Sequence, residues 1–140
     1  MSYKDHIQQV MAGQVGINPY LDLFAVRLEQ AQGGEAVMSM EVSQKYYQGA
    51  GVMQGGLIAA LADEAMAYAL LGEIGDDKII ATVDISHTHL APVFGGRLSA
   101  HSRIIKKGKR MAFLEAQVYV AETMVLNSRA SFMILPSKKS

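Results

Sequence analysis

The segment Leu57–Leu71 constrains the fold of this chain more than any other feature, because it is apolar on nearly every side. It reads LIAALADEAMAYALL and consists mainly of residues with strong helix propensity. A helix without a polar face is buried, so a larger element has to wrap around it. Only Asp63 and Glu64 interrupt the pattern, and the apolar run that they divide is too short for a membrane span.

Extended segments elsewhere in the chain can form that larger element. They alternate apolar and polar residues, or form apolar runs bounded by turn residues, as β-strands do. The predicted strands are residues 22–30, 36–42, 79–90, 97–106, 111–122 and 124–135. A short amphipathic helix is predicted over 3–12, and the long central helix over about 56–72. We therefore expect an α+β fold in one domain, residues 1–140, with an antiparallel sheet of about six strands wrapped around the central helix.

The composition excludes several classes of protein. Half of the 140 residues are hydrophobic, which excludes a disordered chain. Lys and Arg together number 13 and so do Asp and Glu, so we expect no nucleic-acid binding through a general positive field. Without cysteine there is no disulfide framework and no thiol nucleophile. The N-terminal residues lack the apolar run of a secretory signal, so we expect a cytoplasmic protein with no membrane contact.

A metal site is not expected either. His87 and His89 lie two residues apart on a predicted strand, so their side chains share one face. Neither a cysteine nor a third ligand at a recognisable spacing accompanies them. We predict that one of the two histidines lines a pocket and the other packs at an interface, and we expect no metal and no cofactor.

The two acidic residues of the central helix are the first candidates for chemistry. Burying an unpaired carboxylate costs several kcal/mol or raises its pKa. Asp63 and Glu64 are adjacent, and adjacent side chains lie about 100° apart around a helix axis. The interpretation that needs no function is that position 63 or 64 simply faces solvent at the edge of the helix. The alternative is that one faces water while the other faces a site, where partial desolvation makes it a better base near neutral pH.

The glycine pair at the start of the helix is the second candidate. Gly55-Gly56 makes a tight entry into the helix, and peptide N–H groups at a helix start point outward without partners. Such groups polarise a carbonyl or hold an oxyanion. Gly55 and Asp63 are separated by about 12 Å along a helix, at about 1.5 Å per residue. If both act on one bond, they belong to different chains, so the chemistry requires a dimer.

Longer motifs resemble a known family. Residues 48–63 read QGAGVMQGGLIAALAD and resemble the signature of hotdog-fold acyl-CoA thioesterases of the phenylacetate-pathway and 4-hydroxybenzoyl-CoA types. That signature has an Asn or Gln, then His-Gly-Gly at the helix start, then an Asp or Glu seven residues after the second glycine. Residues 82–95 and 105–110 resemble the strand, turn and hairpin that follow in the family. The resemblance spans about residues 20–135 and implies a hotdog fold.

The resemblance also implies roles for residues at matching positions. Asp63 corresponds to the catalytic carboxylate, acting as nucleophile or as general base on water. The Gly55 N–H, from the neighbouring subunit, corresponds to the group that polarises the thioester carbonyl. Gln48 corresponds to the residue that holds the attacking water or the carboxylate. Thr82 and His89 match strand positions that line the acyl pocket.

One position departs from the family pattern. Gln54 stands where the family has histidine, and glutamine donates a hydrogen bond but cannot become charged. We expect Gln54 and Gly56 to contact the substrate at the helix start.

The cluster around Lys106, Lys107 and Arg110 suits the phosphates of coenzyme A, because Lys and Arg donors match phosphate oxygens. A solvated hairpin tip is the simpler interpretation of that cluster.

These motifs favour an acyl-CoA thioesterase that works as a homodimer or as a tetramer of two dimers. Two alternatives stay open. A hydratase or dehydratase of the same fold pairs its carboxylate with a histidine, for which His89 is available. An acyl-CoA-binding or sensing protein without turnover is kept open by Gln54 in place of the family's histidine.

Overall fold

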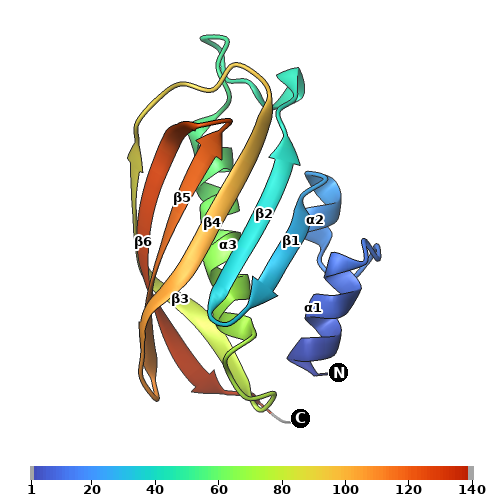
Figure 1. Ribbon diagram of the computed structural model, residues 1–140, viewed down its shortest axis with the longest axis vertical. Helices are drawn as coiled ribbons and strands as arrows, with labels where there is room; N and C mark the ends of the chain where they lie inside the picture. The colour runs from blue at the N-terminus through green and yellow to red at the C-terminus, as the bar shows by residue number, and fades with distance from the viewer. Residues whose placement is uncertain (1, 139–140) are drawn as a thin grey trace.

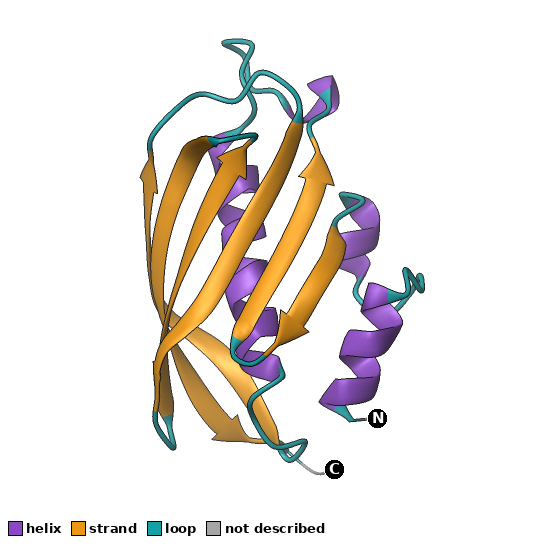
Figure 2. Cartoon of the chain, in the orientation of Figure 1, coloured by secondary structure: helices purple, strands orange, loops and turns teal. Residues whose placement is uncertain are grey.

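A computed structural model describes residues 2–138 of the chain. Three α-helices, one 3-10 turn and six strands follow one another along this part of the sequence (Figures 1 and 2). In order they are α1 (Tyr3–Met11), α2 (Pro19–Leu23), β1 (Arg27–Gln32), β2 (Glu35–Glu41), the 3-10 turn (Gln44–Tyr46), α3 (Gly55–Leu71), β3 (Lys78–His89), β4 (Arg97–Lys107), β5 (Met111–Val120) and β6 (Thr123–Pro136).

All six strands belong to one antiparallel sheet with the order β1-β2-β4-β5-β6-β3. The sheet curves around α3, which lies along its inner face, while α1 and α2 stand beside β1 (Figure 1). The expected α+β architecture, an antiparallel sheet of about six strands wrapped around a long central helix, is therefore confirmed. Within residues 2–138, no helix is long and apolar enough to cross a membrane.

The core explains why α3 is apolar nearly all round. Leu61, Ala62, Ala65 and Met66 are fully buried, since sheet side chains cover the helix. Alanines along α3 allow the sheet to come close, and the Ser102 hydroxyl of β4 donates a 2.7 Å hydrogen bond to the Ala65 carbonyl oxygen. The middle of α3 is thus fixed against the sheet next to its two acidic residues.

The strand predicted over 22–30 is wrong in its first half. Residues Pro19–Leu23 form the short helix α2, and β1 begins only at Arg27. The Asn18 side chain accepts a hydrogen bond from the Tyr20 N–H, and a proline follows at the first helical position. These start signals outweigh the strand-like apolar run, and Ala25, with φ +52°, ends the helical turn before the strand.

Strand β3 forms one edge of the sheet and pairs only with β6 among the described residues. Its register shifts between Thr82 and Asp84, so that Val83 bulges out and is 55% exposed. Beyond the bulge, Ile85 packs against the core and His89 contacts the start of α3. Residues 85, 87 and 89 therefore face the helix, because side chains alternate along a strand.

Candidate functional site

The start of α3 leaves one backbone donor free. The Gln54 side chain caps the helix, and its Oε1 accepts a hydrogen bond from the Gly56 N–H. The Leu57 N–H donates to the Gln54 carbonyl oxygen at 3.1 Å. Between them, no acceptor within residues 2–138 takes the Gly55 N–H, which stays available at the positive end of the helix dipole. Gln54 is therefore an orienting cap in this chain.

Gly55 lies directly against the His89 imidazole of β3. A Cβ atom built at position 55 would sit 3.0 Å from His89 Cε1, so any larger residue would force the ring or the helix start to shift. The two residues line a cleft of about 370 Å³ that also includes Gln48 and the segment from Leu90 to Val93. The predicted residues Gln48, Gly55 and His89 are thus brought together at the start of the helix.

Gln48 lies in the loop before α3 and is exposed. The side-chain Oε1 of Gln48 accepts a hydrogen bond from the Ala50 backbone N–H. The backbone N–H of Gln48 donates to the Val52 carbonyl oxygen at 2.8 Å. The side-chain oxygen is occupied within the loop, so the amide NH₂ group is the part that can hold a water or a carboxylate.

Asp63 lies two turns further along α3, half-buried, on the side that faces β3. Burial raises the pKa of its carboxyl above the ordinary range. Two neighbours from β3 oppose the rise in pKa: the positive charge of His87 and the nearby polar side chain of Thr82. Asp63, predicted as the catalytic carboxylate, and Thr82, predicted as a lining residue of the acyl pocket, therefore lie close together, in a setting that strengthens the carboxylate as a base.

Glu64 differs from its expected position, because neither acid faces open water. The N-terminal segment covers the other side of α3, and Asn18 Nδ2 donates hydrogen bonds to Glu64 Oε1 at 2.9 Å and to Tyr68 Oη at 3.1 Å. His6 Nε2 lies 2.8 Å from the same hydroxyl. Burial, reinforced by the charge of Asp63, raises the pKa of Glu64, and burial with both carboxylates raises the pKa of Tyr20 to about 12.

The sequence placed His87 on one strand face with His89 but did not link it to Asp63, and the structure brings the two side chains near each other. The Nδ1 of His87 contacts Ser128 Oγ on β6, the directly paired residue, and Ser128 is buried. Its charge interacts with Asp63, which raises the pKa of His87, although burial lowers that pKa more. The sequence shows that residues 85, 87 and 89 share one face of the strand, because side chains alternate between the two faces. Only the packing of the strand shows that this face meets α3.

The basic residues lie elsewhere. Lys106, Lys107 and Arg110 are exposed around the turn between β4 and β5, at the end of the sheet opposite the start of α3 (Figure 1). Arg110 lines a hollow of about 760 Å³ together with Lys78, Lys109 and apolar residues of β5 and β6. Within one chain they are therefore not neighbours of Gly55. Residues 2–138 also contain no group of three or more His, Cys, Asp or Glu side chains placed to hold a metal ion.

Apart from the basic residues, the predicted residues thus fall into two groups along α3 of one chain. Gln48, Gly55 and His89 surround a free backbone donor, whereas Asp63 and Thr82 surround a base, about 12 Å away along the helix. A donor that polarises a carbonyl and a carboxylate that delivers a nucleophile are the parts that acyl transfer to water requires.

Comparison with known proteins decides the family. The model of the thioesterase superfamily matches residues 50–127, which is more than half of the chain and includes Gly55, Asp63, Thr82 and His89 but not Gln48. The chain belongs to the thioesterase superfamily. Thioester hydrolysis is accordingly its class of reaction.

Individual relatives agree with this membership. The chain is 25% identical over 119 residues to 1,4-dihydroxy-2-naphthoyl-CoA hydrolase of Listeria monocytogenes, covering 84% of this chain and 97% of that protein. It is 30% identical over 90 residues to human acyl-coenzyme A thioesterase 13, covering 63% of each. A thioesterase family protein from Silicibacter pomeroyi superposes with a TM-score of 0.85 at 20% identity, covering 97% of this chain and all of that one. The last likeness concerns the fold, which is the hotdog fold.

Proposed function

We propose that this thioesterase hydrolyses acyl-CoA thioesters to the free acid and coenzyme A, with each site built from two copies of the chain. The observation that carries the proposal is the free Gly55 N–H at one end of α3 and the half-buried Asp63 carboxylate in its middle. The two relatives named for coenzyme A esters support the choice of substrate.

In the proposed reaction, the Gly55 N–H of one subunit polarises the thioester carbonyl, and its neighbour Gln48 holds the attacking water. Asp63 of the other subunit takes a proton as water adds to the carbonyl carbon, with Thr82 fixing the carboxylate. The C–S bond then breaks, and the proton goes to the departing thiolate. Direct attack by the Asp63 carboxylate is the second route, through an anhydride that water hydrolyses.

Two features support a site shared between subunits. The roughly 12 Å between Gly55 and Asp63 is too long for both to touch one thioester carbon within a chain. In addition, β3 carries Thr82 and His89 and has no second strand partner within residues 2–138, and its apolar Val83 side chain is exposed, so a second copy of the chain can cover this edge. Subunits in such a pair bring the helix start of one towards the carboxylate of the other.

The remaining predicted contacts complete the proposal. Gln54 and Gly56 shape the helix start that receives the thioester, and His89 closes the cleft beside it. Lys106, Lys107 and Arg110 bind the phosphates of coenzyme A from a neighbouring subunit, since they lie far from Gly55 in their own chain. The reaction uses no metal or cofactor, and we propose that it takes place in the cytoplasm.

The test is release of free thiol from a panel of acyl-CoA esters, short aliphatic through long aliphatic and aryl, by the wild-type chain and by Asp63→Asn. Release by wild type and loss in the variant supports the proposal and ranks the acyl groups. Binding of acyl-CoA without release by wild type favours the sensor instead, and addition of water to an enoyl-CoA without thiol release favours a hydratase.

A further inference from the structure

His87 has a defined place that the proposed reaction does not yet use. Strand β3 runs alongside α3, with His89 close to Gly55 at one point and Thr82 close to Asp63 at another. His87 lies between these contacts on the same face of the strand. Its ring is fixed from the far side by Ser128 of β6, whose hydroxyl meets Nδ1. Within residues 2–138, the other ring nitrogen, Nε2, has no hydrogen-bond partner.

A hydrogen bond from a buried serine to one ring nitrogen orients the imidazole, so that the other ring nitrogen can interact with a second group. Ser128 is 1% exposed and directly opposite His87 in the ladder, so the contact is part of the sheet core. Of the two groups whose charges interact with His87, Asp63 favours the charged imidazole and His89 opposes it. Asp63 in turn interacts with Glu64 and Tyr20 on the other side of α3.

We propose that His87 is a positioning residue of the active site, which acts through Asp63 by holding that carboxylate ionised on the acid side of neutrality. The inference rests on the proposed function, in which Asp63 works as the ionised base or nucleophile. An imidazolium beside Asp63 stabilises the carboxylate, and the interaction fades as the pH rises and the imidazole loses its proton, which burial makes easier by lowering the pKa of His87. In this chain, where Gln54 replaces the family's histidine, His87 is the titratable partner of the catalytic carboxylate.

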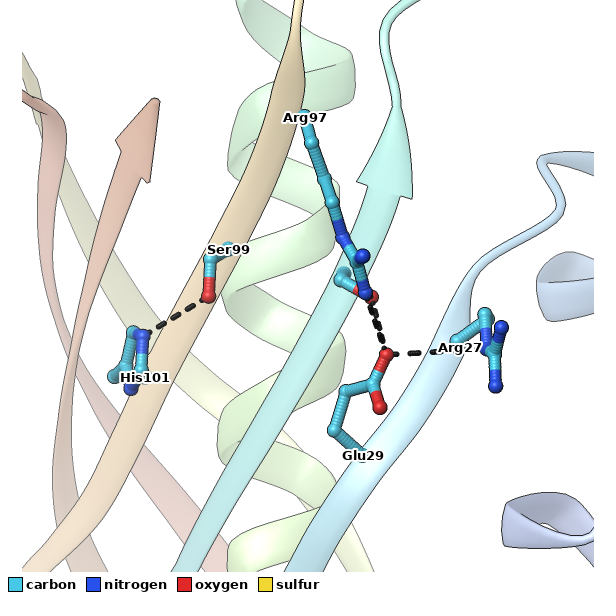
Figure 3. A network of polar contacts seen from close by, with 6 residues as sticks. Arg27, Glu29, Arg97, Ser99 and His101 are labelled. Atoms are coloured by element: carbon cyan, nitrogen blue, oxygen red, sulfur yellow. Dashed lines mark hydrogen bonds and ion pairs between the residues drawn. The ribbon is translucent and has the colours of Figure 1, made fainter. Parts of the chain in front are cut away.

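The outer face of the sheet provides a matched control. His101 on β4 also contacts a serine, with 2.9 Å between its Nε2 and Ser99 Oγ, and its ring meets Tyr119 edge-on. Figure 3 shows this pair next to the network of Arg27, Glu29 and Arg97. The pair lies on the face of β4 turned away from α3, because the residues that alternate with it, Ala100 and Ser102, are buried. His101→Gln and Ser99→Ala therefore remove a histidine–serine pair of similar chemistry without touching α3.

The first experiment measures kcat/KM for acyl-CoA hydrolysis between pH 4.5 and 8.5 in wild type, His87→Gln, Ser128→Ala and the two controls. We expect the ratio of activity at pH 5 to activity at pH 8 to fall about three- to tenfold in His87→Gln, since a stabilising positive charge is lost where Asp63 titrates. Ser128→Ala should lower the same ratio by a smaller factor, and the controls should keep the wild-type ratio. Loss of activity by one factor at every pH would mean a merely structural role and would overturn the inference.

The second experiment needs no turnover. The imidazole resonances of the four histidines are followed by NMR against pH in wild type and in Asp63→Asn. The His87 midpoint should move to lower pH in the variant, because the carboxylate that favours the imidazolium is gone. An unmoved His87 midpoint overturns the inference even if one of its variants fails to fold. A wild-type chain that releases no thiol refutes the proposed function, and the NMR titration still decides whether Asp63 and His87 form a pair.

Discussion

Asp63 and Glu64 are neighbours on one helix, yet the two sides of α3 on which they lie are built differently. Asp63 faces the edge strand β3, where Thr82 and His87 approach it and the strand has no second partner among the described residues. Glu64 faces the N-terminal segment, where Asn18 holds it in a closed network with Tyr68. Burial raises both pKa values, so burial alone does not mark a catalytic acid. The difference is that the Glu64 carboxylate is already hydrogen-bonded to Asn18, whereas the Asp63 carboxylate lies beside an edge strand that a second copy of the chain can approach.

The most severe way to break this comparison is to neutralise each acid in turn. Asp63→Asn should lower kcat/KM by about 10²–10⁴-fold, the range for loss of a general base, because an amide neither takes the proton nor attacks. Glu64→Gln should cost less than about tenfold, since its network lies on the covered side. Thiol release at saturating and limiting acyl-CoA measures both. Equal losses in the two variants would contradict the division of labour between the two sides.

A smaller effect is expected at the open end of α3. Gly55→Ala puts a methyl group 3.0 Å from His89 Cε1, so the ring or the helix start has to move. A misplaced donor of this kind should reduce kcat/KM by about 10–100-fold. Gly72→Ala at the other end of the same helix is the control, because its methyl would meet only Ile7 Cδ1 at 3.7 Å. The assignment of Gly55 fails if both variants hydrolyse acyl-CoA as wild type does.

Substitutions on the side of α3 that the N-terminal segment covers should change the free energy of unfolding. Asn18→Ala removes the cap of α2 and the donor to Glu64 and Tyr68, so the free energy of unfolding should fall by about 1–2 kcal/mol. Ser2→Ala, which removes only the cap of α1, should have a smaller effect. Urea unfolding at fixed protein concentration measures both. A variant at Asn18 as stable as Ser2→Ala would show that the network does not anchor the N-terminal segment.

The smallest effect is a pH dependence. Because burial raises the pKa of Glu64, the folded chain binds this proton more tightly than the unfolded chain, and stability is lost as the pH rises through the acid range. Glu64→Gln keeps an acceptor for Asn18 without the buried charge. Its Tm should therefore exceed that of wild type by roughly 2–4 °C at pH 7.5, and the difference should shrink towards pH 4. A Tm difference that is the same at both pH values would show that ionisation of Glu64 is not its cause.

Much of the fold could be read from local pattern. The apolar run Leu57–Leu71 required a wrapped helix, and the alternating segments supplied the strands, so both were predictable from residues close together in the sequence. The error at 22–30 has the same origin, because Asn18-Pro19 is a helix start that a short apolar run concealed. Motif spacing similarly indicated Asp63 and Gly55 before any geometry was known.

Contacts between distant segments were decided only by the tertiary structure. The sequence by itself determined a buried helix, a sheet around it, and two acids that cannot point the same way. Which acid lies against β3 and which is bound by Asn18 depends on where an edge strand and an N-terminal segment pack, and no local propensity encodes that choice. His87 became a neighbour of Asp63 for the same reason: its face is set by a bulge at Val83 and by pairing with Ser128, 41 residues away along the chain.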